Sequence, residues 1–192
     1  MNRLFALLFS ALALALPAAP AWAAWDIDAL MRTLSLAKVS RATFVEKKHI
    51  AMLDSPVTSS GELLFTAPDR LERRTLKPRP ELMVLEGGAL TLTRGQRQMV
   101  FKLQEYPAIG ALTESIRATL AGDRAALERH YTLKLAGAEP RWSLLLTPRE
   151  ARIRGFVLEI RIDGEHGEVR TVETLQSDQD RSVMTITRAA AP

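Results

Sequence analysis

The apolar residues near the start of the chain follow the period of an α-helix. Between residues 27 and 34 they recur three and four positions apart, which places them on one helix face. Asp26, directly before this segment, is a suitable N-cap, and Trp25 can pack against Leu30 as a hydrophobic staple. The pattern therefore predicts an amphipathic helix that needs an apolar surface to cover.

The period then shortens to that of β-strands. Short runs that alternate or are β-rich are separated by Pro, Gly, Asp and Ser, at roughly the ten-residue spacing of antiparallel hairpins. Strands are expected at residues 43–48, 61–66, 71–76, 81–85, 89–93, 98–103, 131–135, 141–147, 156–162, 169–176 and 182–188. Tight turns are expected at Gly87–Gly88, Arg94–Gln96, Asp163–Gly164 and His166–Gly167. These segments predict a meander of hairpins with one face to bury.

A helical pattern interrupts the strands in the middle of the chain. Residues 108–122 carry one apolar stripe, with Pro107 at its start and Gly122 at its end. Asp123 can cap a further short helix over residues 124–129. The stripe gives this segment a face that can lie on the sheet.

The number of strands determines the expected fold class. A long antiparallel sheet in one domain must curl, and a sheet that curls without closing has an apolar concave face. The helices are the segments available to cover that face. We therefore expect an α+β fold, mainly antiparallel β: an incompletely closed half β-barrel of about ten or eleven strands, with helices covering the concave face.

Composition excludes several function classes. The 192 residues contain no Cys, which excludes disulfides, a thiol nucleophile and Cys-ligated zinc. His49, His130 and His166 show no pairing at metal-ligand spacing, and the serines lack a nucleophile-elbow context. We expect no catalytic residue, no metal and no cofactor, and hence no enzyme.

The first 23 residues have the organisation of a signal peptide. Met1–Arg3 is a short positive start, Leu4–Leu16 is an apolar run too short to span a bilayer, and Ala21–Ala23 suits a signal peptidase. We expect cleavage after Ala23, a single domain over residues 24–192 and a periplasmic location. That domain has 25 basic and 22 acidic side chains, a mild excess that does not indicate a nucleic-acid binder.

The order of several short motifs resembles that of LolA-type outer-membrane lipoprotein carriers. The motifs of the first half are Ala42-Thr43-Phe44, Ser59–Phe65, Ala67–Leu71, Pro80 and Leu85–Gly88, and those of the second half are Leu144–Arg149 and Ser177–Ser182. Their order and spacing, more than any single motif, carry the likeness, which extends over nearly all of the mature chain.

This resemblance implies a half-barrel whose cavity takes the acyl chains of a lipidated protein or other amphiphile. The implied partners are an inner-membrane release complex or exporter and an outer-membrane receptor. Each CH₂ removed from water contributes ~0.8 kcal/mol, so one acyl chain offers on the order of 10 kcal/mol before ordering costs. No catalysis is required, and a carrier that works by diffusion is most simply a monomer.

Two features depart from the family pattern. In the family a basic residue, usually Arg, precedes the Pro at a strand end and bonds the lid helices across the cavity mouth, whereas Ala67 precedes Pro68 here. The chain also ends at Pro192, soon after the last expected strand, where typical carriers continue. Both features leave open another amphiphile, such as a glycolipid or a lipid-linked pigment precursor.

The candidate cavity residues are the apolar members of the strands and of the central helix. They are Phe44, Leu63, Phe65, Leu71, Leu92, Met99, Phe101, Trp142, Leu144, Phe156 and Leu158 on strands, and Ile109, Leu112, Ile116 and Leu120 on the helix. Alternation assigns each a face but does not distinguish a filled core from an open trough.

A basic cluster includes Arg70, Arg73 and Arg74. It is interpreted either as a solvated sheet edge or as a docking surface for an acidic partner or an anionic head group. Arg70 or Arg73 is also a candidate to replace the absent latch.

Two functions thus remain open. The leading one is a periplasmic carrier of acyl chains. The other is a periplasmic adaptor or lipid-binding accessory of a membrane exporter, which in its plainest form has a packed interior.

Overall fold

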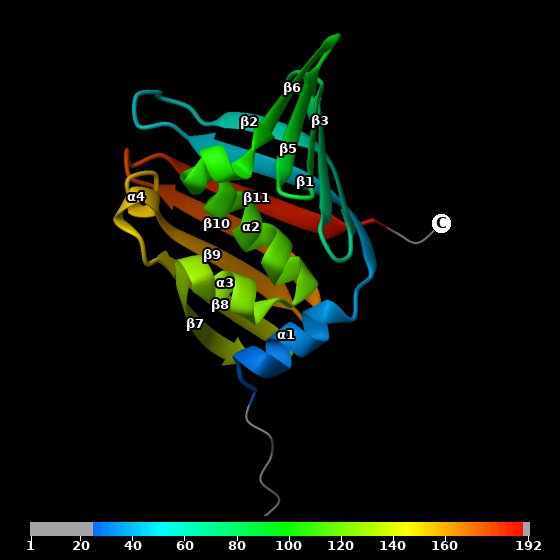
Figure 1. Cartoon of the computed structure of the whole chain (residues 1–192), viewed down its shortest axis with the longest axis vertical. Helices are drawn as coiled ribbons and strands as arrows, with labels where there is room; N and C mark the ends of the chain where they lie inside the picture. The colour runs from blue at the N-terminus through cyan, green and yellow to red at the C-terminus, as the bar shows by residue number, and fades with distance from the viewer. Residues whose placement is uncertain (1–24, 190–192) are drawn as a thin grey trace, which may run out of the picture.

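One antiparallel sheet of eleven strands forms the framework of the protein (Figure 1). The computed structural model describes residues 25–189, so the expected signal peptide lies outside the described residues. The strands are β1 (Val39–His49), β2 (Val57–Thr66), β3 (Arg70–Lys77), β4 (Glu81–Glu86), β5 (Ala89–Arg94), β6 (Arg97–Lys102), β7 (Tyr131–Ala138), β8 (Arg141–Pro148), β9 (Val157–Glu165), β10 (Glu168–Gln176) and β11 (Arg181–Arg188).

The strand order confirms the expected open sheet. It runs β6-β5-β4-β3-β2-β1-β11-β10-β9-β8-β7, so strands that are neighbours in the sheet are also consecutive in sequence, except for β1 and β11. In that pair Phe44 lies opposite Ile186 and joins the two halves of the chain. Strands β6 and β7 are the free edges, and the barrel does not close.

The helices lie on one side of this sheet (Figure 1). They are α1 (Ile27–Ser35), α2 (Pro107–Ala121), α3 (Arg124–His130) and α4 (Ala151–Arg154), with a 3₁₀ turn, η1 (Leu103–Glu105). Neither α4 nor η1 was expected from the sequence. None of the helices within residues 25–189 has the length and apolar character needed to cross a membrane.

The predicted helix ends are confirmed by their capping contacts. The Asp26 carboxylate accepts a hydrogen bond of 2.8 Å from the backbone N–H of Ala29, and Asp123 accepts one of 2.9 Å from that of Ala126. Gly122 ends α2 in the left-handed region, with φ of 67°. A side chain there would also meet the backbone of α1, since an added Cβ would lie 2.2 Å from the Met31 carbonyl oxygen.

The turn expected at Asp163–Gly164 is wrong, because both residues lie within β9. Gly164 is required by packing instead: a Cβ there would lie 2.1 Å from Cζ2 of Trp142 on β8. The indole Nε1–H of Trp142 donates to the carbonyl of His166, 2.8 Å away, in the turn that follows. The chain therefore reverses at His166–Gly167, the other turn expected there.

The core fills only one part of the concave face. Helices α1, α2 and α3 pack there against β7, β8 and β9, three strands at one edge of the sheet. The buried members of this cluster are Leu30, Met31, Leu34, Ala111, Ala118, Ala126, Leu127, Tyr131, Trp142, Leu144, Leu146, Ile153, Val157, Ile160 and Ile162.

Candidate functional site

A cavity of about 320 Å³ lies between α2 and the rest of the concave face. Strands β1 to β5 and β9 to β11 supply its wall, together with the end of α1. The apolar lining consists of Leu34, Ala37, Val39, Ala42, Leu63, Phe65, Leu71, Met83, Leu85, Leu90, Leu112, Ile116, Leu120, Ile162, Val169, Val172, Met184 and Ile186. Because α2 covers this cavity, we refer to α2 as the lid.

Strand register explains why one side of the cavity is continuous hydrocarbon. Phe65 of β2 lies opposite Leu71 of β3, which lies opposite Leu85 of β4, which in turn lies opposite Leu90 of β5. Alternate residues of a strand face the same side of a sheet, so these paired positions form one row across four strands. The lid contributes Leu112, Ile116 and Leu120 to the same cavity.

The structure brings six of the candidate cavity residues together at this cavity. These are Leu63, Phe65, Leu71, Leu112, Ile116 and Leu120. Sequence reasoning missed other lining residues, including Met83 on β4, Val172 on β10, and Met184 and Ile186 on β11. The signal for each was the same alternation of inward and outward residues along its strand.

Three other candidates are buried and do not line the cavity: two lie in the packed core, and one lies under the side chain of Arg73. Trp142 and Leu144 face the same side of the sheet, but the helices cover them, and they are buried in the core cluster. Phe44 is buried under the guanidinium of Arg73, whose Cζ lies 4.6 Å from the ring centroid. These three residues shape the floor of the concave face without lining the cavity.

The remaining candidates lie outside the lining for local reasons. Gln176 pairs with Val157 and Leu175 with Glu159, so a bulge leaves Leu158 unpaired and turned out. Leu158 is 43% exposed for this reason. The other four residues of this group are Phe156, which is 63% exposed, Ile109, which is 43% exposed on the lid, and Leu92 and Met99, which pair with each other on β5 and the edge strand β6.

Phe101 also lies at this edge. Its ring stacks edge-on against Tyr106, with centroids 5.7 Å apart, at the start of the lid. It therefore supports the lid from outside the lining.

A polar cluster interrupts the apolar wall. We call it the Arg73 cluster: Arg73, Glu46, Ser59 and Ser182. Nη2 of Arg73 donates to Glu46 at 2.5 Å and to the Ser59 hydroxyl at 3.2 Å, while Ser182 donates to the other Glu46 oxygen. Burial alone would raise the pKa of Glu46, but the charge of Arg73 and these hydrogen bonds outweigh it and hold the pKa below its ordinary value.

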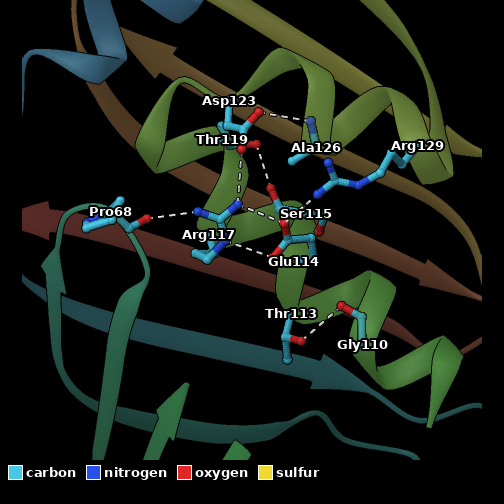
Figure 2. Close-up of polar contacts among 10 residues, drawn as sticks. All are labelled: Pro68, Gly110, Thr113, Glu114, Ser115, Arg117, Thr119, Asp123, Ala126 and Arg129. Atoms are coloured by element: carbon cyan, nitrogen blue, oxygen red, sulfur yellow. Dashed lines mark hydrogen bonds and ion pairs between the residues drawn. The ribbon is translucent and has the colours of Figure 1, made fainter. Parts of the chain in front are cut away.

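The lid is tied to the sheet by Arg117 (Figure 2). Its guanidinium donates two hydrogen bonds of 2.7 Å to Glu114 and one of 2.8 Å to the carbonyl oxygen of Pro68, in the β2–β3 turn. Asp123 accepts a further, longer bond of 3.4 Å. The hydrogen bonds to Glu114 exceed the opposing effect of burial and raise the pKa of Arg117.

The arginines expected in the basic cluster face different directions. Arg70 pairs with Glu72 and Glu86 at the rim of the sheet. Arg73 lines the cavity, whereas its neighbour Arg74 is exposed beside Glu62. Neither Arg70 nor Arg73 takes the place of the absent latch, because both are held by carboxylates of the sheet.

The described residues offer no metal site, since residues 25–189 hold no group of three or more His, Cys, Asp or Glu side chains placed to bind an ion. The arrangement is a largely apolar cavity whose wall contains the Arg73 cluster and the ion pair of Arg188 with Glu168, and which α2 covers on one side. Its apolar lining suits hydrocarbon.

The chain is similar to several known proteins. An outer-membrane lipoprotein carrier protein of Dechloromonas aromatica (strain RCB) is 28% identical over 151 residues, which cover 79% of this chain and 70% of that protein. Among solved structures, a LolA superfamily protein from Nitrosomonas europaea superposes with a TM-score of 0.44 at 9% identity, over 86% of this chain and 93% of that chain. A DUF1329 family protein from Desulfovibrio piger gives a TM-score of 0.48 at 10% identity, over 84% and 89%.

The family model described as "Outer membrane lipoprotein carrier protein LolA-like" matches residues 18–192. The match covers nearly the whole chain and includes every strand of the sheet. The protein thus belongs to the LolA-like family of outer membrane lipoprotein carriers, which are periplasmic transport proteins and not enzymes.

Proposed function

We propose that the mature protein, residues 24–192 after cleavage at Ala23, is a periplasmic carrier that takes the acyl chains of a lipoprotein or related amphiphile toward the outer membrane. The observation that carries this proposal is the apolar cavity of about 320 Å³ beneath the lid. Its volume falls within the range of roughly 300–1,000 Å³ found for small-molecule sites. An inner-membrane release complex or exporter would supply the cargo and an outer-membrane receptor would accept it.

The physical basis is the transfer of hydrocarbon from water. Each CH₂ that enters the cavity contributes ~0.8 kcal/mol, and ordering of the chain offsets part of that gain. The sheet provides the fixed part of the wall, and the lid provides Leu112, Ile116 and Leu120. A helix that packs mainly on other helices and is tied to the β2–β3 turn by Arg117 can move without dismantling the sheet.

The cavity favours this function over an adaptor with a packed interior. An adaptor that only docks to an exporter needs no apolar hollow, and its partner surface would suffice. The exposed Arg70 and Arg74 stay candidates for such a surface in either function.

The test compares two substitutions of the lid that each introduce a carboxylate, one in the cavity lining and one at an exposed position. Leu112→Asp puts a carboxylate into the cavity wall, and we expect it to weaken displacement of the neutral fluorophore N-phenyl-1-naphthylamine by an acyl ligand at least about tenfold. Ile109→Asp is the matched control, because Ile109 lies three residues earlier on the same helix and is 43% exposed. Equal binding by both folded variants would refute the cavity as the acyl site.

A further inference from the structure

Arg73 is a charged side chain in a wall of hydrocarbon. Its register neighbours are Leu63 on β2 and Met83 on β4, both of which line the cavity. Phe44 lies beneath its guanidinium. Removing a charge from water is costly, so a plain acyl cavity would be better served by an apolar residue at this position.

The Arg73 cluster leaves part of this guanidinium unused. Both hydrogen bonds to the cluster come from Nη2, which donates to Glu46 and Ser59. The Nε–H is buried and has no hydrogen-bond partner among the described residues. An unpaired buried donor carries a desolvation cost that an incoming acceptor would remove. The side chain lines the cavity and keeps 26% of its surface exposed, so a molecule in the cavity can contact this guanidinium.

The charges around the cavity indicate what kind of acceptor fits. Glu46 already neutralises Arg73. Arg188, the other arginine in the wall, is 69% exposed and pairs with Glu168, which also pairs with Arg170. A carboxylate or phosphate that entered would therefore bring an uncompensated charge into an apolar space, which is strongly unfavourable. A neutral carbonyl oxygen accepts the same hydrogen bond and adds no net charge.

We propose that Arg73 recognises a neutral carbonyl oxygen of the cargo, that of an ester-linked or amide-linked acyl group. The cavity then selects acyl compounds over plain alkyl chains and over free fatty acids. This inference rests on the carrier function proposed above, and it specifies which chemical group of the cargo the cavity recognises.

Three ligands of matched chain length separate these possibilities. They are methyl palmitate, hexadecyl methyl ether and palmitate, each titrated as a competitor of N-phenyl-1-naphthylamine on the mature protein. We expect the ester to bind about tenfold more tightly than the ether, because one hydrogen bond to a charged donor distinguishes them. We expect palmitate to bind more weakly than the ester.

Substitution of Arg73 identifies the donor. Arg73→Lys keeps a positive charge beside Glu46 but has no Nε–H, so the ester-to-ether ratio should fall to about one while ether binding persists. Arg74→Lys is the matched control on the exposed side and should keep the tenfold ratio. The double variant Arg73→Met with Glu46→Gln removes both charges together and should also give a ratio near one.

These measurements separate a failure of the carbonyl assignment from a failure of the carrier function. If none of the three ligands displaces the fluorophore, acyl binding itself is refuted. If ester and ether bind equally, or if the ratio survives Arg73→Lys, the carbonyl assignment is overturned while the carrier stands. If palmitate binds most tightly, the Arg73 cluster recognises an anionic carboxylate, which also overturns the assignment.

Discussion

Arg117 of the lid donates a hydrogen bond of 2.8 Å to the backbone carbonyl oxygen of Pro68. The family pattern described above has a link in the other direction, from a basic residue before this proline to the lid helices, and the sequence predicts that this link is absent here. Ala67 occupies that position, and the lid supplies the arginine instead. The same two parts of the fold are therefore tied together, with donor and acceptor exchanged.

Removing this link should make the lid open more easily. Arg117 is only 13% exposed and bonds Glu114 as well as Pro68, so Arg117→Ala should lower the free energy of unfolding by about 1–2 kcal/mol. It should also raise the dissociation rate of a bound acyl fluorophore several-fold, as measured by stopped-flow displacement. Arg129→Ala is the control, because Arg129 contacts Glu114 at 3.4 Å and not Pro68. An unchanged dissociation rate in a folded Arg117→Ala variant would make the link purely structural.

Gly122 holds the lid against α1, and its substitution should cost more than backbone strain alone. Gly122→Ala places an L-residue at a φ of 67° and sets its Cβ against the Met31 carbonyl. Gly95→Ala is the matched control, since its φ is 56° and a Cβ there meets nothing within 4 Å. We expect Gly95→Ala to cost about 1–2 kcal/mol and Gly122→Ala clearly more in urea unfolding. Equal losses of unfolding free energy in the two variants would show that α1 can shift away from the new Cβ without a measurable penalty.

Glu46 should make stability depend on pH in the acidic range. Its pKa is lower in the folded chain than the ordinary 4.5, so its ionised contacts stabilise the fold above that pH and are lost as the pH falls further. Glu46→Gln should lower the free energy of unfolding at pH 7 by about 1–3 kcal/mol. The difference between wild type and variant should shrink when urea unfolding is repeated at about pH 3. A difference that stays constant with pH would mean that the Glu46 carboxylate contributes no charge-dependent stability.

Local signals predicted the framework well because they depend on near neighbours along the chain. Asp26 caps α1, and the stripe that ends at Gly122 forms the lid. Predictions failed where a distant residue decides the local structure. Gly164 reads as a turn in the sequence, but the indole of Trp142 requires a glycine within the strand. Leu158 fits the alternation of an inward residue, but a bulge turns it out.

The division of the concave face could not be predicted from alternation. Leu144 and Leu63 have the same pattern around them, and both face the same side of the sheet. Leu144 is buried because α1, α2 and α3 pack over β7, β8 and β9, while Leu63 lines the cavity that remains beneath α2. The part of the concave face that the helices cover is determined by the tertiary contacts of α1 and α2, and the pattern within the strands does not reveal it.

Filling the cavity should separate binding from stability. Met83 lines the wall between Arg73 and Leu92, so Met83→Trp should place an indole in the empty space and weaken acyl binding at least about tenfold. Because an apolar group in an apolar cavity gains contacts, the free energy of unfolding should stay the same or rise. Met99→Trp is the control, since Met99 is on the edge strand β6 and outside the lining. Acyl binding that survives Met83→Trp in a stable protein would place the binding site elsewhere.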